Sequence, residues 1–156
     1  MNRARPVDMN LARQYISNCV AYGSEEMQQI CDAAAQNTIA VVLGFSENDN
    51  NSLYISQCII DNSGKIVMKR RKLKPTHMER TIFGEASGPS LLNVKKLSIG
   101  KVGALSCWEH IQPLLKYHTM CQREEIHVSA WPPLDPHPGG ESFWGMSAEG
   151  NIHLIP

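Results

Sequence analysis

The spacing of apolar and polar positions divides this chain into short helices and strands separated by turn-forming residues. A helix is predicted from Ser24 to Asn37, because the serine can cap it and apolar residues then recur every three or four positions. Residues 39–44 form a continuous β-prone run, which is typical of a buried strand. Residues 1–23 show no strong period, and the polar residues 46–52 predict a loop.

A hairpin is predicted next. Residues 53–60 and 65–70 are both strand-like, and they flank the turn sequence Asp-Asn-Ser-Gly at residues 61–64. Proline and glycine then interrupt any regular period, so residues 71–92 are expected to be irregular.

The remaining pattern predicts a strand at residues 101–106, a helix that begins near Pro113 and a strand at residues 126–130. The apolar face of that helix is expected to consist of Ile111, Leu114, Leu115 and His118. This order of elements predicts an α/β protein with a mixed sheet and with helices on one face.

Composition narrows the class of protein. A chain of 156 residues fits one domain, over residues 1–156, and its 15 basic and 15 acidic residues give no global field that would recruit nucleic acid or an anionic membrane. No apolar stretch approaches the length of a membrane span, and the first residues lead into no signal sequence. The five cysteines are odd in number and scattered, which favours a reducing, cytoplasmic setting.

The candidate chemistry centres on Cys107, which ends an apolar strand within Gly-Ala-Leu-Ser-Cys-Trp-Glu-His at residues 103–110. A thiol at the junction of a strand and a helix is expected to be accessible and to favour the thiolate. Lys72 lies in a basic run, and Glu79 follows seven residues later. Thiol, ammonium and carboxylate together suit covalent attack on an electrophilic carbon. The alternative is a buried strand-end cysteine with a solvated lysine and a surface glutamate.

Two segments decide between these interpretations. Residues 69–80, Lys-Arg-Arg-Lys-Leu-Lys-Pro-Thr-His-Met-Glu-Arg, and residues 103–110 closely resemble signature blocks of the nitrilase family of carbon–nitrogen hydrolases. Further similar blocks occur in the family's order at residues 43–47, 52–54, 126–132 and 146–150. The resemblance extends over about residues 11–150, and it is greatest to the fungal nitrilase and cyanide hydratase branch.

The resemblance implies a partial α-β-β-α sandwich and no cofactor. It also implies that Cys107 is the nucleophile, which adds to a C≡N carbon to give a thioimidate, while Lys72 stabilises the tetrahedral species and Glu79 supports it. The residues expected to shape the substrate pocket are Trp108, Glu109, His110 and Trp131. The backbone N–H of Trp108 is in addition a natural partner for developing charge.

One departure from the family pattern concerns the general base, a glutamate in a Pro-Glu block on an early strand. No Pro-Glu pair occurs in this chain, which resembles the middle of a nitrilase with both ends absent. Loss of a positioned general base typically costs on the order of 10²–10⁴ in rate. We therefore expect little activity on a nitrile or on cyanide, and the choice between amide and acid as product stays open.

Two other functions remain as alternatives. The chain could be an inactive fragment that forms homo-oligomers or associates with longer homologues, since uncovered sheet edges and apolar faces favour association. It could also be a metal-binding module, because Cys107 and His110, and likewise His118 and Cys121, have ligand types and spacings that zinc accepts.

Overall fold

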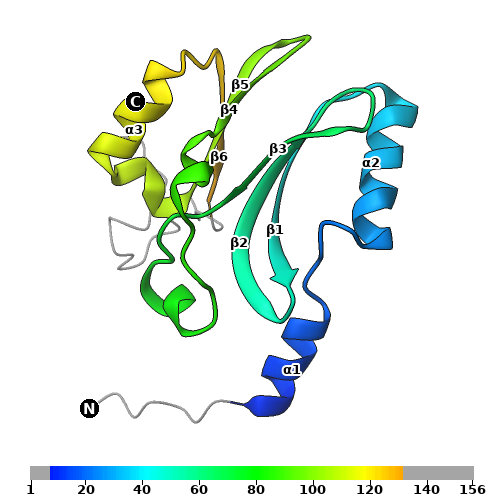
Figure 1. Ribbon diagram of the computed structural model, residues 1–156, viewed down its shortest axis with the longest axis vertical. Coiled ribbons are helices and arrows are strands. Elements are labelled where there is room, and N and C mark those ends of the chain that lie inside the picture. Colours follow the sequence, from blue (N-terminus) through cyan, green and yellow to red (C-terminus); the bar gives the residue numbers. More distant parts are fainter. Residues whose placement is uncertain (1–7, 132–156) are drawn as a thin grey trace, which may run out of the picture.

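The computed structural model describes residues 8–131, which form four layers (Figure 1). The helices are α1 (Met9–Ser17), α2 (Glu25–Asn37) and α3 (Pro113–Cys121). The strands are β1 (Val41–Asp49), β2 (Ser52–Ile60), β3 (Ile66–Arg71), β4 (Val94–Leu97), β5 (Gly100–Ser106) and β6 (Ile126–Ala130). Three short 3₁₀ turns complete the described part: η1 (His77–Thr81), η2 (Gly88–Leu91) and η3 (Cys107–Ile111). The sequence block at residues 146–150 lies outside the described residues.

The first sheet has the order β1-β2-β3 and is antiparallel throughout. Its central strand, β2, is covered on both faces. Successive side chains of a strand point to opposite sides, so those of β2 enter two different apolar clusters. Cys58 and Ile60 pack against Met27 and Ala34 of α2, whereas Ile59 points into a second cluster. Full burial of a side chain such as Ile59 contributes roughly 1.5–3 kcal/mol. The helix α2 therefore covers one face of this sheet.

The second sheet has the order β4-β5-β6 and is mixed, since β5 pairs antiparallel with β4 and parallel with β6. A parallel pair needs a crossover connection, and η3 and α3 supply it. Val102 of β5 packs with Ile59 and Met68, so the two sheets meet through this cluster. The layers are thus α2, first sheet, second sheet and α3, and the expected partial α-β-β-α sandwich is confirmed (Figure 1).

The β2–β3 hairpin turns where the sequence predicts it. The side chain of Asp61 accepts hydrogen bonds from the backbone N–H groups of Ser63 and Lys65, which fixes the turn. Gly64 has φ 80°, and a Cβ atom built on it would lie 2.4 Å from the carbonyl oxygen of Cys31 in α2. Glycine is therefore required here both by the backbone conformation and by the close approach of the helix.

Four expectations about the elements are wrong. Helices lie on both outer faces rather than on one, and α1 forms within the segment that showed no period. The predicted loop at residues 46–52 instead continues β1 to Asp49, because residues 46–49 pair with β2 and the Glu47 carboxylate accepts hydrogen bonds from Arg71 of β3, on the far side of β2. On α3, Leu115 is buried as predicted, but Leu114 is 84% exposed.

Within residues 8–131, no helix has both the length and the apolar character needed to cross a bilayer.

Candidate active site

Lys72 and Glu79 form a close ion pair directly after β3. The Lys72 side chain is only 1% exposed, and its Nζ donates to Glu79 Oε2 at 2.6 Å and to Thr76 Oγ1 at 3.0 Å. Partial burial raises the pKa of Glu79, but the hydrogen bonds from Lys72 and Thr76 outweigh it and hold the pKa below its ordinary value. The lysine and the glutamate that the sequence singled out are therefore brought together as a charged pair.

The local sequence explains why the chain folds back here. Thr76 and Glu79 form a capping box at η1, in which the Thr76 backbone N–H donates to Glu79 Oε2 at 2.6 Å. Arg80 Nε donates to the carbonyl oxygen of Pro75 at 3.0 Å and fastens the same loop. This turn places the Glu79 carboxylate against the end of the Lys72 side chain. Thr76 is a site residue that the sequence reasoning missed, although the Thr-x-x-Glu spacing signals it.

Cys107 is the first residue of η3, at the carboxyl end of β5. Its φ of 49° is unusual for a residue other than glycine, and its side chain is half-buried. Burial raises the pKa of its thiol, whereas the charge of Lys72 and a hydrogen bond from the Trp108 backbone N–H lower it. Glu79 also acts on the thiol and raises its pKa, so thiol, ammonium and carboxylate share one electrostatic environment.

The net pKa of the Cys107 thiol is raised, which corrects the expectation that this junction favours the thiolate. The helix that follows is a 3₁₀ turn of five residues, and α3 begins only at Pro113. A strong helix field at the sulfur is therefore missing, because a macrodipole requires a longer run of aligned peptides. Desolvation dominates instead and raises the pKa of the thiol.

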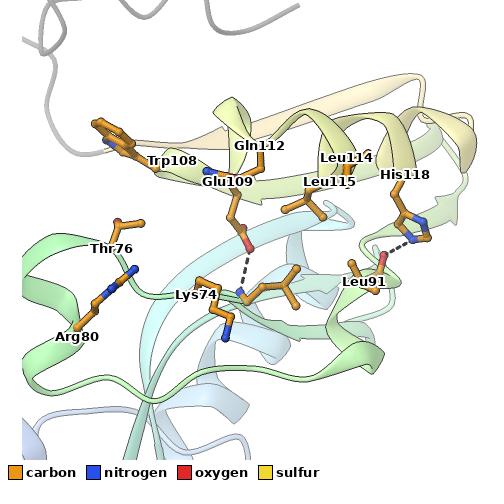
Figure 2. A pocket seen from close by; sticks show the side chains of 11 residues that line it. Lys74, Thr76, Arg80, Leu91, Trp108, Glu109, Gln112, Leu114, Leu115 and His118 are labelled. Carbon is orange, nitrogen blue, oxygen red and sulfur yellow. Dashed lines mark hydrogen bonds between the residues drawn. The ribbon is translucent and has the colours of Figure 1, made fainter.

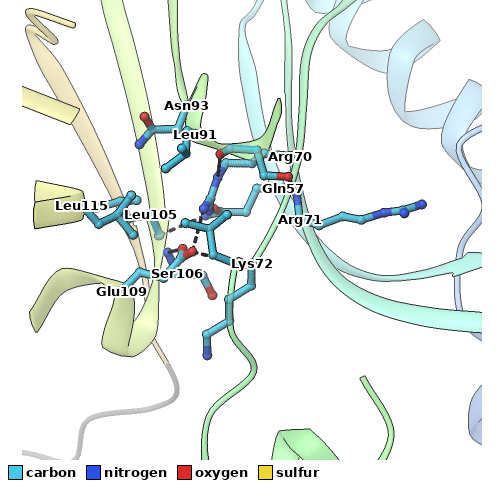
Figure 3. Close-up of polar contacts among 12 residues, drawn as sticks. Gln57, Arg70, Arg71, Lys72, Leu91, Asn93, Leu105, Ser106, Glu109 and Leu115 are labelled. Atoms are coloured by element: carbon cyan, nitrogen blue, oxygen red, sulfur yellow. Dashed lines mark hydrogen bonds and ion pairs between the residues drawn. The ribbon is translucent and has the colours of Figure 1, made fainter. Parts of the chain in front are cut away.

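Glu109 is buried and links the two sheets. Its carboxylate is 4% exposed and accepts from Arg70 Nη2 at 2.7 Å, from the Leu73 backbone N–H at 3.0 Å and from the Ser106 backbone N–H at 2.9 Å. Arg70 also donates to Gln57 Oε1 at 2.5 Å (Figure 3). Both carboxylate oxygens of Glu109 thus accept hydrogen bonds from the protein. This arrangement suits Glu109 to holding η3 on β3 rather than to transferring protons.

Arg70 belongs to the basic block, but the sequence did not distinguish it from its neighbours. Figure 3 shows that Arg70 and Arg71 point to opposite sides of β3, while the Lys72 amine points away from the Arg70–Glu109 contact. Three consecutive cations therefore have three different partners, since Arg71 binds Glu47 and Asp49. Strand alternation, together with the place where β3 ends, is the signal that separates them.

The rings of His110 and Trp131 stack on each other, and His110 also contacts the backbone of Cys107. Their ring centroids lie 5.3 Å apart with an interplanar angle of 27°. His110 Nδ1 lies 2.6 Å from the carbonyl oxygen of Cys107 and must donate to it, because a carbonyl only accepts. Burial lowers the pKa of His110. The Nε1 atom of Trp131 is buried and has no hydrogen-bond partner among the residues that the structure describes.

A cavity of about 590 Å³ lies between η3 and α3 on one side and the loop after β3 on the other (Figure 2). Its lining is mainly apolar and also includes cations, and it comprises Leu73, Lys74, Thr76, Arg80, Leu91, Trp108, Glu109, Gln112, Leu114, Leu115 and His118. Trp108 and Glu109 line this cavity, whereas His110 and Trp131 do not, and the assignment of these four residues to the substrate pocket stays a prediction. Cys107, Lys72 and Glu79 are not part of its lining, but Thr76 and Trp108 are their direct neighbours.

The zinc alternative gains no support from the geometry. Within residues 8–131, no three His, Cys, Asp or Glu side chains are arranged to hold a metal ion. Both ring nitrogens of His110 are already hydrogen-bonded, and His118 Nε2 donates to the carbonyl oxygen of Leu91 at 3.2 Å. Cys121 is exposed at the end of α3.

Comparison with known proteins identifies relatives over most of the chain. Residues 8–151 match the sequence model of the family described as carbon–nitrogen hydrolase. An arylacetonitrilase of Aspergillus niger is 73% identical over 146 residues, which are 94% of this chain and 43% of that protein. An arylacetonitrilase of Aspergillus kawachii is 62% identical over 150 residues, which are 96% of this chain and 46% of that protein. The chain thus spans less than half the length of these relatives.

Solved structures share the fold at much lower identity. A carbon–nitrogen hydrolase from Helicobacter pylori G27 has a TM-score of 0.63 at 17% identity, over 77% of this chain and 41% of that chain. A mutant amidase from Nesterenkonia sp. AN1, with the result of Michael addition of acrylamide at its active-site cysteine, has a TM-score of 0.64 at 14% identity, over 76% and 47% of the two chains.

Proposed function

We propose, since the chain belongs to the carbon–nitrogen hydrolase family, that Cys107 adds covalently to the carbon of a nitrile. The observation that carries the proposal is the shared electrostatic environment of the Cys107 thiol, the buried Lys72 amine and the Glu79 carboxylate. A thiol whose pKa responds to the charges of a paired ammonium and carboxylate supports covalent attack by that thiol. The fold and the sequence relatives support the same chemistry.

The proposed step balances without any other reactant. The sulfur of Cys107 forms a bond to the nitrile carbon, one π bond of C≡N breaks, and the thiol proton moves to the nitrogen to give a thioimidate. Burial raises the pKa of the thiol and so favours the protonated form, which supplies this proton to the nitrogen. Water would then add to the same carbon to give a tetrahedral species. Loss of the thiol from this species releases the amide, whereas loss of ammonia leaves a thioester on Cys107 that a second water hydrolyses to the acid and the free thiol.

Lys72 is suited to stabilise charge that develops during this step. Its amine is almost fully buried, so its field is screened much less than that of a surface lysine. Glu79 and Thr76 hold the amine in one position at 2.6 and 3.0 Å. The Trp108 backbone N–H, which already contacts the sulfur, is a second donor beside the reacting atoms.

We propose arylacetonitriles as the substrate class, because both relatives described above are arylacetonitrilases. The cavity of about 590 Å³ beside Trp108 is within the usual size of small-molecule sites and carries the apolar side chains Leu73, Leu91 and Leu115. An aromatic ring suits such a lining, whereas cyanide would need no cavity of this size. Cyanide is therefore the weaker candidate.

We further propose that turnover by this chain alone is impaired. The described site holds a nucleophile, a lysine and one supporting glutamate, and no Pro-Glu pair occurs in the sequence to supply the family's general base. A missing general base slows both proton transfer and the attack of water on the thioimidate. The covalent adduct should consequently accumulate rather than turn over quickly.

The test is the intact mass of the chain after incubation with phenylacetonitrile. The proposal predicts a gain equal to the whole mass of the nitrile, located on Cys107 by peptide mapping and absent in Cys107→Ala. Cys121→Ala, which removes an exposed cysteine, is the matched control and should be modified normally. An unmodified chain, or an adduct that persists in Cys107→Ala, would refute the proposal. Rapid ammonia release that depends on Cys107 would refute only the impairment.

A second proposed function is association with another copy or with a longer relative. Leu114, Tyr117 and Met120 are 84%, 69% and 58% exposed, and their spacing places them along one side of α3. An apolar helix face of this kind favours association. Triple substitution by Gln should convert any oligomer measured by sedimentation into monomer, and unchanged sedimentation would rule this surface out.

We also propose a reducing compartment for this chain, because all five cysteines are free thiols. A disulfide or a sulfenic acid at Cys107 would abolish its nucleophilicity. The same intact-mass measurement on protein prepared without reductant tests this proposal.

A further inference from the structure

Two histidines and a glutamate form a continuous row of hydrogen bonds that ends at the backbone of Cys107. His127 Nδ1 lies 2.9 Å from both carboxylate oxygens of Glu124, and His127 Nε2 lies 2.9 Å from His110 Nε2. His110 Nδ1 ends the row at the Cys107 carbonyl oxygen, 2.6 Å away. The row links the connection before β6, the strand β6 itself and η3.

Counting protons along this row restricts its charge. The Cys107 carbonyl can only accept, so His110 Nδ1 carries a proton, and the Glu124 carboxylate likewise requires one on His127 Nδ1. The two Nε2 atoms then face each other at hydrogen-bond distance, and one proton must lie between them. Three protons on four ring nitrogens make the pair of rings singly positive, which the negative charge of Glu124 balances.

We infer that Glu124, His127 and His110 form a charge-balanced hydrogen-bond chain whose two rings share three protons and hold the Cys107 carbonyl in place. The three residues are positioning residues, because none of them reaches the sulfur itself. What they hold is the positive-φ backbone of Cys107, a conformation that a residue other than glycine adopts only when its surroundings enforce it. The inference rests on the proposed function only for the role of that sulfur.

Burial decides where the extra proton resides. It lowers the pKa of His110, whose side chain is almost fully buried, while His127 is partly exposed and faces the carboxylate directly. The shared proton is therefore drawn toward the ring that faces Glu124, and His110 accepts at Nε2 and donates at Nδ1.

Gly103 provides the space for the carboxylate. It is the register partner of His127 on the parallel strand β5, and a Cβ atom built on it would lie 1.8 Å from Glu124 Oε2. The backbone at Gly103 has no positive φ that would itself require glycine. The absence of a side chain at this position thus serves the seating of Glu124 under His127.

Other charged groups also lie around the two histidines, on the elements that pack against them. Lys116 of α3 lines the same cavity of about 310 Å³ as the two histidines and Glu124. Glu109 and Arg70 also act on His110, the first raising and the second lowering its pKa, and the Cys107 thiol adjoins the end of the row. Glu124 is the anion in direct contact with His127.

The chain of bonds should fail at high pH. When the shared proton leaves, two Nε2 lone pairs face each other at 2.9 Å, and the contact between the rings becomes repulsive. The His110 ring then loses its support from β6, and the Cys107 carbonyl loses its fixed donor. The pair titrates as a unit, so one midpoint describes the loss of this proton.

The direct test is ¹⁵N NMR of the histidine side chains in the 156-residue chain. At neutral pH we expect three protonated nitrogens in this pair, with a shared proton between the two Nε2 atoms. Glu124→Gln should lower the midpoint of its loss by about 1–3 pH units, since an opposite charge at this range stabilises the cation by that amount. The matched control is Glu125→Gln, whose carboxylate accepts from the Lys101 backbone N–H instead.

Gly103→Ala retains every charge and displaces the Glu124 carboxylate first, because the new Cβ would lie 1.8 Å from Oε2 and 3.2 Å from Val94 Cγ2. It should therefore lower the midpoint as Glu124→Gln does. Two neutral rings in the wild-type chain at neutral pH would overturn the inference. Equal midpoints in Glu124→Gln and Glu125→Gln would overturn it as well. These readouts need no nitrile, so they stand or fall separately from the proposed covalent addition.

The effect on Cys107 is measured by its alkylation with iodoacetamide, followed by peptide mass spectrometry across pH. The rate profile should contain an inflection at the NMR midpoint, and Glu124→Gln should shift both to lower pH together. A structural role without this coupling would leave the profile of Cys107 unchanged in Glu124→Gln, and that result would refute the positioning role.

Discussion

Replacing Glu109 by glutamine should strongly destabilise the fold, although it changes only one atom of the side chain. The carboxylate accepts from Arg70, from the Leu73 backbone N–H and from the Ser106 backbone N–H, and both charged side chains are almost fully buried. Glutamine removes the charge that balances Arg70 and presents an NH₂ group to a donor. Breaking a buried pair in this way typically costs about 3–5 kcal/mol.

The assay is urea unfolding followed by circular dichroism, with thermal unfolding beside it. A loss of 3–5 kcal/mol corresponds to a fall in Tm of about 6–20 °C for a chain of this size. Glu85→Gln is the matched control, because Glu85 pairs with Lys74 at the surface, where both side chains are more than half exposed. That variant should change the free energy of unfolding by less than about 1 kcal/mol.

A double-mutant cycle then isolates the pair itself. Arg70→Met combined with Glu109→Gln should cost less than the sum of the two single variants by about 1–3 kcal/mol, because the second change removes a charge already left unpaired. If Glu109→Gln unfolds at the same urea concentration as Glu85→Gln, Glu109 does not join the two sheets, and the interpretation given above is wrong.

Three further predictions concern the turn and the site. Gly64→Ala should destabilise the chain by about 1–3 kcal/mol in the same urea assay, because φ is 80° and a backbone oxygen of α2 lies 2.4 Å from the new Cβ. The control is Gly23→Ala, whose new Cβ has nothing within 4 Å, and its free energy of unfolding should change by less than about 1 kcal/mol. Lys72→Gln should slow alkylation of Cys107 at neutral pH several-fold, because the amine lowers the pKa of that thiol. Glu79→Gln should accelerate it, because the carboxylate raises the same pKa; equal rates in the two variants would contradict the geometry.

Periodicity predicted the elements that bury an apolar face and failed where polar groups are satisfied internally. The helix from Ser24, the hairpin around Gly64 and the strand at residues 101–106 follow directly from apolar spacing and turn chemistry. The extension of β1 does not follow from the sequence pattern. Glu47 is a charged residue whose place in a strand becomes understandable only from its hydrogen bond with Arg71 of β3. Local propensity contains no information about a partner on another strand.

The sequence named candidate members of the site, which stay a prediction, but it did not reveal their electrostatics. The motif resemblance named Cys107, Lys72 and Glu79, and the structure brings these groups into one environment. Sequence could not reveal that the thiol is desolvated, since burial depends on the packing of both sheets. It also could not separate Glu109, which links the sheets, from a residue of the pocket, because the sequence around Glu109 does not reveal that Arg70 lies against it.

The central claim is that the sulfur of Cys107 bonds to the nitrile carbon, and ¹³C NMR with phenylacetonitrile labelled at that carbon observes this bond directly. The account predicts that the nitrile resonance loses intensity to a broad, protein-bound imidate or thioester signal in the wild-type chain and not in Cys107→Ala. A spectrum in which the label remains entirely free nitrile, or in which Cys107→Ala gives the same bound signal, would contradict it.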